Sequence, residues 1–155
     1  MGVGRNFGEA FGKAQDAAGM TLPTHGNVFI SVLDEDKASI IDIARDLQEL
    51  GFSLFASRGT AEIIQKNGVS CTQVNKVREG RPNIIDKIKN DDIDFIINTT
   101  EHKQTVADYY HMRGYTLRHK ITYTTTLAGA RAAILALKSG TIHQVNCLQA
   151  LHADL

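Results

Sequence analysis

Val28-Phe29-Ile30-Ser31-Val32-Leu33 is the stretch of this sequence that decides its fold. A short run that is almost wholly apolar is typical of a strand buried on both faces, as the strands of parallel sheets are. Apolar residues at helical spacing follow it, at Ile40, Ile41, Ala44, Leu47 and Leu50. Gly51 comes next and is the kind of residue that ends helices. The stretch therefore predicts a buried strand followed by an amphipathic helix that packs on a sheet.

The same alternation of strand and helix continues along the chain. Further strands are predicted at 52–56, 71–74, 93–97 and 116–119, with an edge strand at 144–148. Helices are predicted at 57–66, from Pro82 onward, at 103–113 and from 124–126 to about residue 138. Either Asp34 or Asp36 is expected to cap the helix that begins near Ile40. Strands that alternate with helices through short loops predict an α/β fold, in which helices cover both faces of a parallel sheet.

The first residues differ in composition from the rest. They are rich in glycine and alanine, and apolar residues at Phe7, Ala10, Phe11 and Ala14 predict a short amphipathic helix. The sequence shows no obvious partner for this helix within the chain. We therefore interpret residues 1–22 as the tail of a preceding unit with its linker, and residues 23–155 as a separate domain.

The composition excludes several classes of protein. The chain has 155 residues, enough for one domain, and its 17 Lys and Arg balance its 17 Asp and Glu. Nucleic-acid-binding domains usually carry a net basic charge, so no nucleic-acid partner is expected. No apolar run approaches the roughly 20 residues of a membrane span, and neither Cys71 nor Cys147 lies in a metal-binding spacing. We expect a soluble cytoplasmic domain without a metal, whose two cysteines are reduced core thiols.

Two loops that follow predicted strands carry hydroxyl and amide groups. Ser57-Arg58-Gly59-Thr60 follows the second strand and opens a helix, where exposed N–H groups and the helix dipole favour an anion. Asn98-Thr99-Thr100 follows the fourth strand. Ligands of open parallel sheets bind beyond the carboxyl ends of the strands, so both loops are expected to line one crevice. Ordinary helix capping is the alternative explanation for each.

Cationic side chains are available near the same edge of the sheet. Lys76 follows the third strand, and Lys37 lies near the start of the first helix of the regular pattern. Hydroxyls, backbone N–H groups and one or two ammonium groups together suit a phosphate dianion. The chain has no Walker-type glycine loop with a lysine, so hydrolysis of a nucleoside triphosphate is not indicated. Solvated surface lysines remain the alternative.

Several motifs resemble one family along nearly the whole chain. The segments Asn75-Lys76-Val77-Arg78-Glu79-Gly80-Arg81-Pro82, Ile96-Ile97-Asn98-Thr99-Thr100 and Tyr123-Thr124-Thr125-Thr126-Leu127 are similar to the bacterial carbamoyl phosphate synthetase large subunit. The part that they resemble is its C-terminal allosteric domain. The segment 2–14 looks like the end of the ATP-grasp unit that precedes this domain. The resemblance implies a methylglyoxal-synthase-like fold of three layers, with a central parallel sheet of five strands and helices on both faces.

The resemblance also implies a ligand and its site. In bacterial enzymes of this type UMP inhibits and IMP activates, at overlapping sites. The phosphate pocket of the family matches Lys37, Ser57, Gly59, Thr60 and Lys76. Its crevice-lining positions match Ser31, Asn98, Thr99 and Thr100, and Lys103 stands where the family often has an arginine. Tyr123 and Thr125 match positions that reach the activator ornithine at the junction with the preceding domain.

For the whole protein, the resemblance implies a ligase that makes carbamoyl phosphate by glutamine hydrolysis, for pyrimidine and arginine biosynthesis. ATP, Mg and K are expected in the rest of the subunit, and no cofactor in this domain. The partners implied are the remainder of the large subunit, the glutaminase small subunit and a second copy of this domain. Urea-cycle members, which bind N-acetylglutamate, have a tryptophan where this chain has Lys76, and this sequence contains no tryptophan.

Two other functions are compatible with the fold that is implied. The first is a phosphate lyase like methylglyoxal synthase, which uses an aspartate in the loop after the third strand; the only acid of that loop here is Glu79. The second is an oligomerisation module with a vestigial pocket. The fragment is therefore expected not to be an enzyme by itself, and no catalytic residue is assigned.

Overall fold

The computed structural model describes residues 1–99, 106–140 and 144–153, which contain one sheet of five parallel strands. The strands are β1 Asn27–Ser31, β2 Ser53–Ala56, β3 Thr72–Gln73, β4 Phe95–Asn98 and β5 Thr122–Thr124, in the spatial order β3-β2-β1-β4-β5. The helices described are α1 Phe7–Ala17, the short 3-10 helix η1 Asp34–Asp36, α2 Ile40–Glu49, α3 Arg58–Lys66, α4 Ile84–Lys89, α5 Val106–Arg118, α6 Leu127–Ser139 and α7 Leu148–Ala153. The predicted α/β fold is confirmed.

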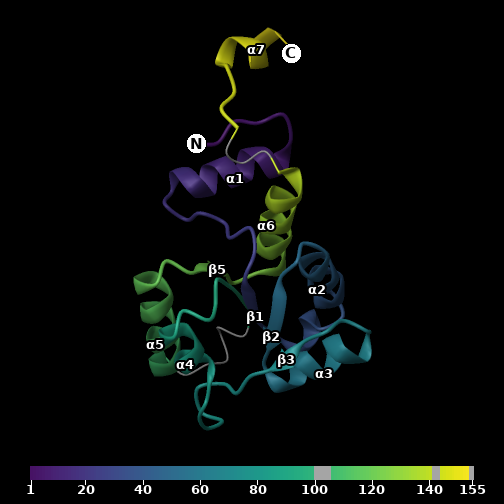
Figure 1. Ribbon diagram of the computed structural model, residues 1–155, viewed down its shortest axis with the longest axis vertical. Coiled ribbons are helices and arrows are strands. Elements are labelled where there is room, and N and C mark those ends of the chain that lie inside the picture. The colour runs from purple at the N-terminus through teal and green to yellow at the C-terminus, as the bar shows by residue number, and fades with distance from the viewer. Residues whose placement is uncertain (100–105, 141–143, 154–155) are drawn as a thin grey trace.

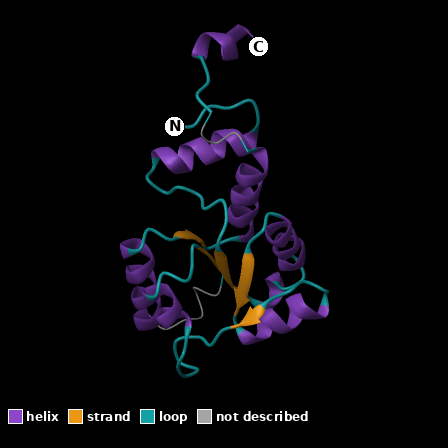
Figure 2. Cartoon of the chain, in the orientation of Figure 1, coloured by secondary structure: helices purple, strands orange, loops and turns teal. Residues whose placement is uncertain are grey.

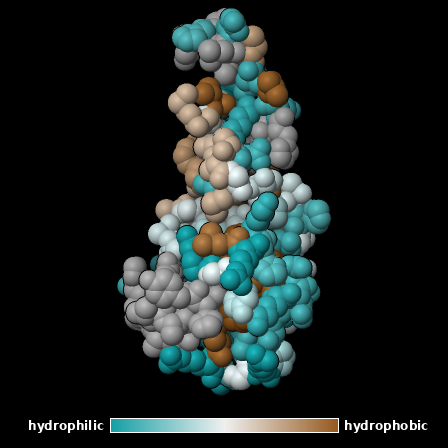
Figure 3. All heavy atoms as spheres, turned by 90° about the vertical axis from the view of Figure 1, so that its left-hand side faces the viewer, coloured by the Kyte–Doolittle hydropathy of each residue, from teal (hydrophilic) through white to brown (hydrophobic). Residues whose placement is uncertain are grey.

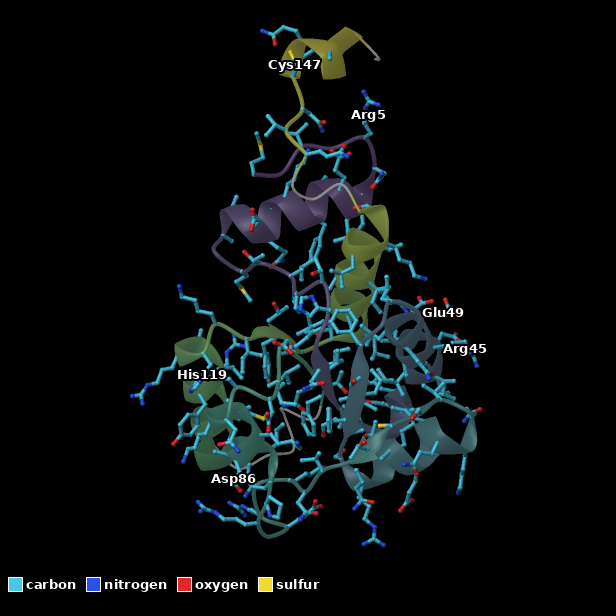
Figure 4. All side chains as sticks on the ribbon, viewed as in Figure 1. Arg5, Arg45, Glu49, Asp86, His119 and Cys147 are labelled. Carbon is cyan, nitrogen blue, oxygen red and sulfur yellow. The ribbon has the colours of Figure 1, made fainter. Side chains whose placement is uncertain are left out.

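The sheet is the middle of three layers (Figures 1 and 2). Alternate residues of β1 point to opposite faces, so Val28 and Ile30 join one apolar cluster and Phe29 joins another. The first cluster contains buried residues of α2, α3 and α6, and the second contains residues of α4 and α5. Figure 4 shows the labelled Arg45 and Glu49 of α2 pointing away from the sheet, as an amphipathic helix requires.

The predicted strand at 116–119 is wrong. These residues lie at the end of α5 and just after it, and the strand comes later, at β5. Gly114, the residue just after the predicted helix 103–113, stands inside α5. A glycine within a helix costs only about 1 kcal/mol relative to alanine. The burial of Met112 and Thr116 on the flanking turns, where the Thr116 hydroxyl also donates to the Arg113 carbonyl, outweighs that cost.

Three other local predictions are also wrong. The segment 144–147 has no regular structure, and the helix α7 follows it in place of an edge strand. Asp34 and Asp36 do not cap α2 but form η1, and Ser39 takes the capping position. The fourth helix begins after Asn83, whose side chain accepts from two amides of the first turn, and Pro82 precedes it.

The helix α1 has a partner inside the chain, contrary to expectation. It packs across the C-terminal end of α6, the end farther from the sheet (Figure 1). The approach is close, because a Cβ at Gly8 would lie 2.4 Å from the carbonyl oxygen of Leu135. Phe11 packs against the main apolar cluster, whereas Phe7 is 61% exposed. Figure 3 shows apolar side chains gathered at the end of the molecule that holds α1. The boundary between residues 1–22 and 23–155 stays a prediction.

The carboxylate of Glu9 ties three segments together at this end of the molecule. It accepts from the Lys13 ammonium at 2.7 Å, from the Arg5 amide at 2.8 Å and from the Asn146 side chain at 2.6 Å. The hydrogen bond from Lys13, followed by those from Arg5 and Asn146, lowers the pKa of Glu9 to about 2. Asn146 lies in the segment that leads to α7, so Glu9 anchors that segment to α1.

Acid should therefore weaken the fold through Glu9. Its pKa is lower in the folded chain than the ordinary 4.5, so its contribution is complete above about pH 4.5 and is lost as the pH falls toward 2. Urea unfolding followed by circular dichroism should show Glu9→Gln less stable than the unmodified chain near neutral pH, with a smaller further loss in acid. Glu62→Gln, at an exposed pair with Arg58, is the control and should keep the full acid loss. Parallel pH curves for Glu9→Gln and the unmodified chain would contradict this role.

The two cysteines differ from the expected pair of core thiols. Cys147 is exposed and its thiol donates to the Gln149 side chain, so it is not part of the core. Cys71 is half-buried beside the main apolar cluster, and burial raises the pKa of its thiol to about 11. Cys71 therefore stays protonated near neutral pH and is a poor nucleophile.

Among the helices in the described ranges, none is long and apolar enough to cross a membrane.

Candidate functional site

The carboxyl ends of three neighbouring strands bring polar side chains together. Ser31 ends β1, Asn98 ends β4, and these two residues pair in register. Ser57 follows β2, and its amide donates to the carbonyl of Ile30 on β1 at 3.0 Å. Ser31, Ser57, Asn98 and Thr99 are all at least 94% buried. The strand order reverses between β1 and β4, and this is the point where open parallel sheets bind ligands.

The start of α3 forms one wall of this site. Ser57 occupies the capping position, but its hydroxyl donates to the Thr60 hydroxyl at 3.2 Å and does not cap the helix. Thr60 in turn accepts from the amide of Val32 at 3.3 Å, which joins α3 to the end of β1. The first N–H groups of a helix have no partner within the helix. They and the helix dipole favour an anion here by about 0.3–1 kcal/mol.

Lys37 adds a positive charge at the same place. Its ammonium nitrogen lies 3.2 Å from the point where a Cβ on Gly59 would stand. It also pairs with the carboxylate of Asp34 at 2.8 Å, although the side chain of Asp34 is 89% exposed. The absence of a side chain at position 59 is therefore what allows the ammonium group to approach the first turn of α3.

Asp36 holds the segment that carries Lys37, and sequence analysis missed this role. Its carboxylate accepts from the Thr99 hydroxyl at 2.6 Å, and the same hydroxyl accepts from the Leu33 amide at 3.0 Å. The amide of Thr99 donates to the carbonyl of Ser31 at 3.0 Å. Thr99 thus fixes the turn after β1 against the end of β4. The only sequence signal was an acid just after a strand, which also fits a helix cap.

Lys76 lies on the next strand end. It follows β3, which pairs with the end of β2 through a bond from the Val74 amide to the carbonyl of Ala56. The backbone amide of Lys76 donates to the carboxylate of Glu79 at 2.8 Å, and this hydrogen bond closes the loop. Within the ranges that the structure describes, no hydrogen bond or ion pair joins the Lys76 ammonium to the other predicted phosphate-site residues. The structure places Lys76 at the carboxyl-end edge of the sheet, and its part in a phosphate site stays a prediction.

The two residues assigned to ornithine lie in different surroundings. Tyr123 is 9% exposed, and its hydroxyl accepts from the side-chain amide of Asn98 at 2.8 Å. Thr125 is exposed in the turn before α6. Tyr123 therefore contacts the predicted nucleotide crevice directly.

Thr100 and Lys103, the remaining predicted site residues, lie outside the described residues. The described part of the chain contains no cluster of three or more His, Cys, Asp or Glu that could hold a metal ion.

Comparison with known proteins identifies the family. Residues 39–125 match the family model of the MGS-like domain, which is more than half of the chain. The chain belongs to the MGS-like domain family. Over all 155 residues it is 52% identical to the carbamoyl phosphate synthase large chain of Pseudomonas putida and 47% identical to that of Xanthomonas axonopodis pv. citri. The resemblance to these large chains is confirmed, and this MGS-like domain spans 14% of the length of each of these two curated relatives.

A solved structure agrees with the family. Methylglyoxal synthase from Elizabethkingia anophelis superposes on 78% of this chain and 82% of its own chain, with a TM-score of 0.57. At 17% sequence identity this likeness shows the fold alone. It confirms the expected methylglyoxal-synthase-like arrangement of sheet and helices.

Proposed function

We propose that this MGS-like domain is the regulatory domain of a carbamoyl phosphate synthase large chain. In this proposal it binds UMP as inhibitor or IMP as activator, and it modulates carbamoyl phosphate synthesis from the C-terminal end of that chain. The full-length relatives supply the context. The crevice at the ends of β1, β2 and β4 supplies the binding site.

One observation carries the proposal: the Lys37 ammonium lies against Gly59 at the first turn of α3. The Lys37 cation thus lies at the first N–H groups of α3, next to the Ser57 and Thr60 hydroxyls, which are bonded to each other. A phosphate monoester dianion matches this set, because its oxygens accept several hydrogen bonds and its charge pairs with an ammonium group. The buried polar residues Ser31, Asn98 and Thr99 continue this set of polar groups toward β4, where the ribose would lie.

Calorimetric titration with UMP and with IMP tests the proposal. The chain should bind at least one of them, and Lys37→Ala should weaken binding about 10-fold or more, since a hydrogen bond to a charged group contributes about 1.5–3 kcal/mol. Lys76→Ala should also weaken binding, because a bound phosphate would draw the Lys76 ammonium toward it. Lys66→Ala, in the last turn of α3, is the control and should bind as the unmodified chain does. Absence of binding at millimolar UMP and IMP would defeat the proposal.

Regulation needs more than this domain. Allostery is a coupling free energy between two sites, typically about 1–3 kcal/mol. The proposal places the second site, with ATP, Mg and K, in the remainder of the large chain. It assigns Tyr123 and Thr125 to the ornithine side and includes self-association and the glutaminase small subunit as partners. Two results together would support this separation of the binding site from the coupled site. This chain alone should bind the nucleotide, and the full-length enzyme carrying Lys37→Ala should no longer be regulated by it.

A phosphate lyase remains the second candidate because of the fold shared with methylglyoxal synthase. The acid available after β3 is Glu79, whose carboxylate accepts from the amide of Lys76 in its own loop. A carboxylate engaged in this way is poorly placed as a general base. Incubation with dihydroxyacetone phosphate is therefore expected to give no methylglyoxal, and turnover abolished by Glu79→Gln would favour the lyase instead.

A further inference from the structure

Tyr123 and Asn98 form a buried pair at the floor of the crevice. The side-chain amide of Asn98 donates to the Tyr123 hydroxyl at 2.8 Å. Asn98 is fully buried and Tyr123 is 9% exposed, so this bond is shielded from water. A hydrogen bond in such surroundings is costly to break, because the buried donor would be left unsatisfied.

The sheet places the two residues together. Tyr123 on β5 pairs in register with Ile96 on β4. Asn98 lies two residues beyond Ile96, and side chains two apart on a strand point to the same face. The Tyr123 ring can therefore reach diagonally along that face to Asn98, at the point where β4 ends.

The Tyr123 ring is also held from outside the sheet. It belongs to the apolar cluster that contains Phe29 and Ile96, and the Arg113 guanidinium lies 4.8 Å from its centre. A cation over an aromatic face is attracted by the ring. The hydroxyl is thus fixed at the end of a rigid, packed side chain, which makes it a firm acceptor for the Asn98 amide.

We propose that Tyr123 is a positioning residue for the nucleotide crevice, acting through Asn98. This inference rests on the proposed function. By accepting from the amide nitrogen of Asn98, Tyr123 fixes the orientation of that side chain at the end of β4, where the proposed crevice lies. Tyr123 therefore belongs to the crevice as well as to the side of the domain that was assigned to ornithine.

Tyr123→Phe tests this inference, because it removes the hydroxyl and leaves the ring in place. UMP and IMP affinity, measured by calorimetry, should fall about 10-fold. In an Asn98→Ala background the same substitution should have almost no further effect, since the two residues act as one unit. Tyr115→Phe, in the same apolar cluster, is the matched control and should leave affinity unchanged.

A second measurement needs no ligand. The two side-chain amide protons of Asn98 should give separate, slowly exchanging NMR signals that shift and exchange faster in Tyr123→Phe but not in Tyr115→Phe. Unchanged nucleotide affinity in Tyr123→Phe, or an equal loss with and without Asn98, would overturn the inference. Unchanged Asn98 signals would do the same. If the unmodified chain binds no nucleotide, the proposed function fails and the role in the crevice fails with it, whereas the NMR comparison still shows whether Tyr123 orients Asn98.

Discussion

Gly59→Ala should lower the affinity for UMP and IMP by about 10-fold or more while leaving the fold intact or slightly more stable. A methyl group at this position would lie 3.2 Å from the Lys37 ammonium nitrogen. That is tighter than an ordinary contact, and the lysine, being the far end of a flexible chain, would move away. The site would lose the cation at the first turn of α3, and the methyl group would occupy the space through which a phosphate approaches the backbone.

The effects on binding and on stability should have opposite signs. Alanine is favoured over glycine in helices by up to about 1 kcal/mol, and position 59 lies within α3. Calorimetry for affinity and thermal unfolding for stability separate the two effects. Gly114→Ala serves as the control, because no atom of the described residues lies within 4 Å of its Cβ position; it should raise the melting temperature without changing affinity. Full affinity in Gly59→Ala would show that the phosphate lies elsewhere.

Gly8→Ala should destabilise the chain by about 1–3 kcal/mol, even though alanine favours helices. The added Cβ would stand 2.4 Å from the Leu135 carbonyl oxygen and 2.8 Å from its carbon. Both atoms belong to the backbone of α6, which cannot turn aside as a side chain can. The helix α1 would have to move away from α6, and Phe11 would lose part of its packing against the main apolar cluster.

Urea unfolding measures this loss directly, and hydrogen exchange locates it. Exchange should become faster in α1 and in the part of α6 near Leu135, with little change in the strands. Gly114→Ala should stabilise in the same assay, because it gains helix propensity without a clash. A Gly8→Ala chain as stable as the unmodified one would show that α1 does not pack closely on α6.

The central strands β1, β2 and β4 were predictable, since they are short and mostly apolar runs, and so was the helix α2 with its regular apolar stripe. Local patterns failed where distant residues decide the structure. The stretch 116–119 contains residues that favour strands, yet burial of Met112 and Thr116 keeps the helix α5 going past Gly114. The partner of α1 was not visible either, because the alanine-rich face of α6 carries no sign of which helix packs on it.

The candidate site, like the fold, was predictable from the sequence only in part. Residue types at strand ends predicted that Ser57 and Asn98 lie at one edge of the sheet, and the structure places them on either side of the end of β1; Ser31 came only from the family resemblance. Spacing along the chain gave no hint that the carboxylate of Asp36 would reach Thr99, which is 63 positions away. Nor did it reveal the bond between Asn98 and Tyr123. Such contacts depend on strand order, which follows from how the whole chain packs.

An NMR titration of the isotope-labelled chain with UMP tests the central claim most directly. If a nucleoside monophosphate binds at the ends of β1, β2 and β4, saturable shifts should appear at the amides of Arg58, Gly59 and Thr60 and at those of Ser31 and Thr99. The amides of α1 and of the turn around Gly51 should stay unchanged. Saturable shifts confined to those distant segments, or no shifts at millimolar UMP, would contradict the claim that this crevice is a nucleotide site.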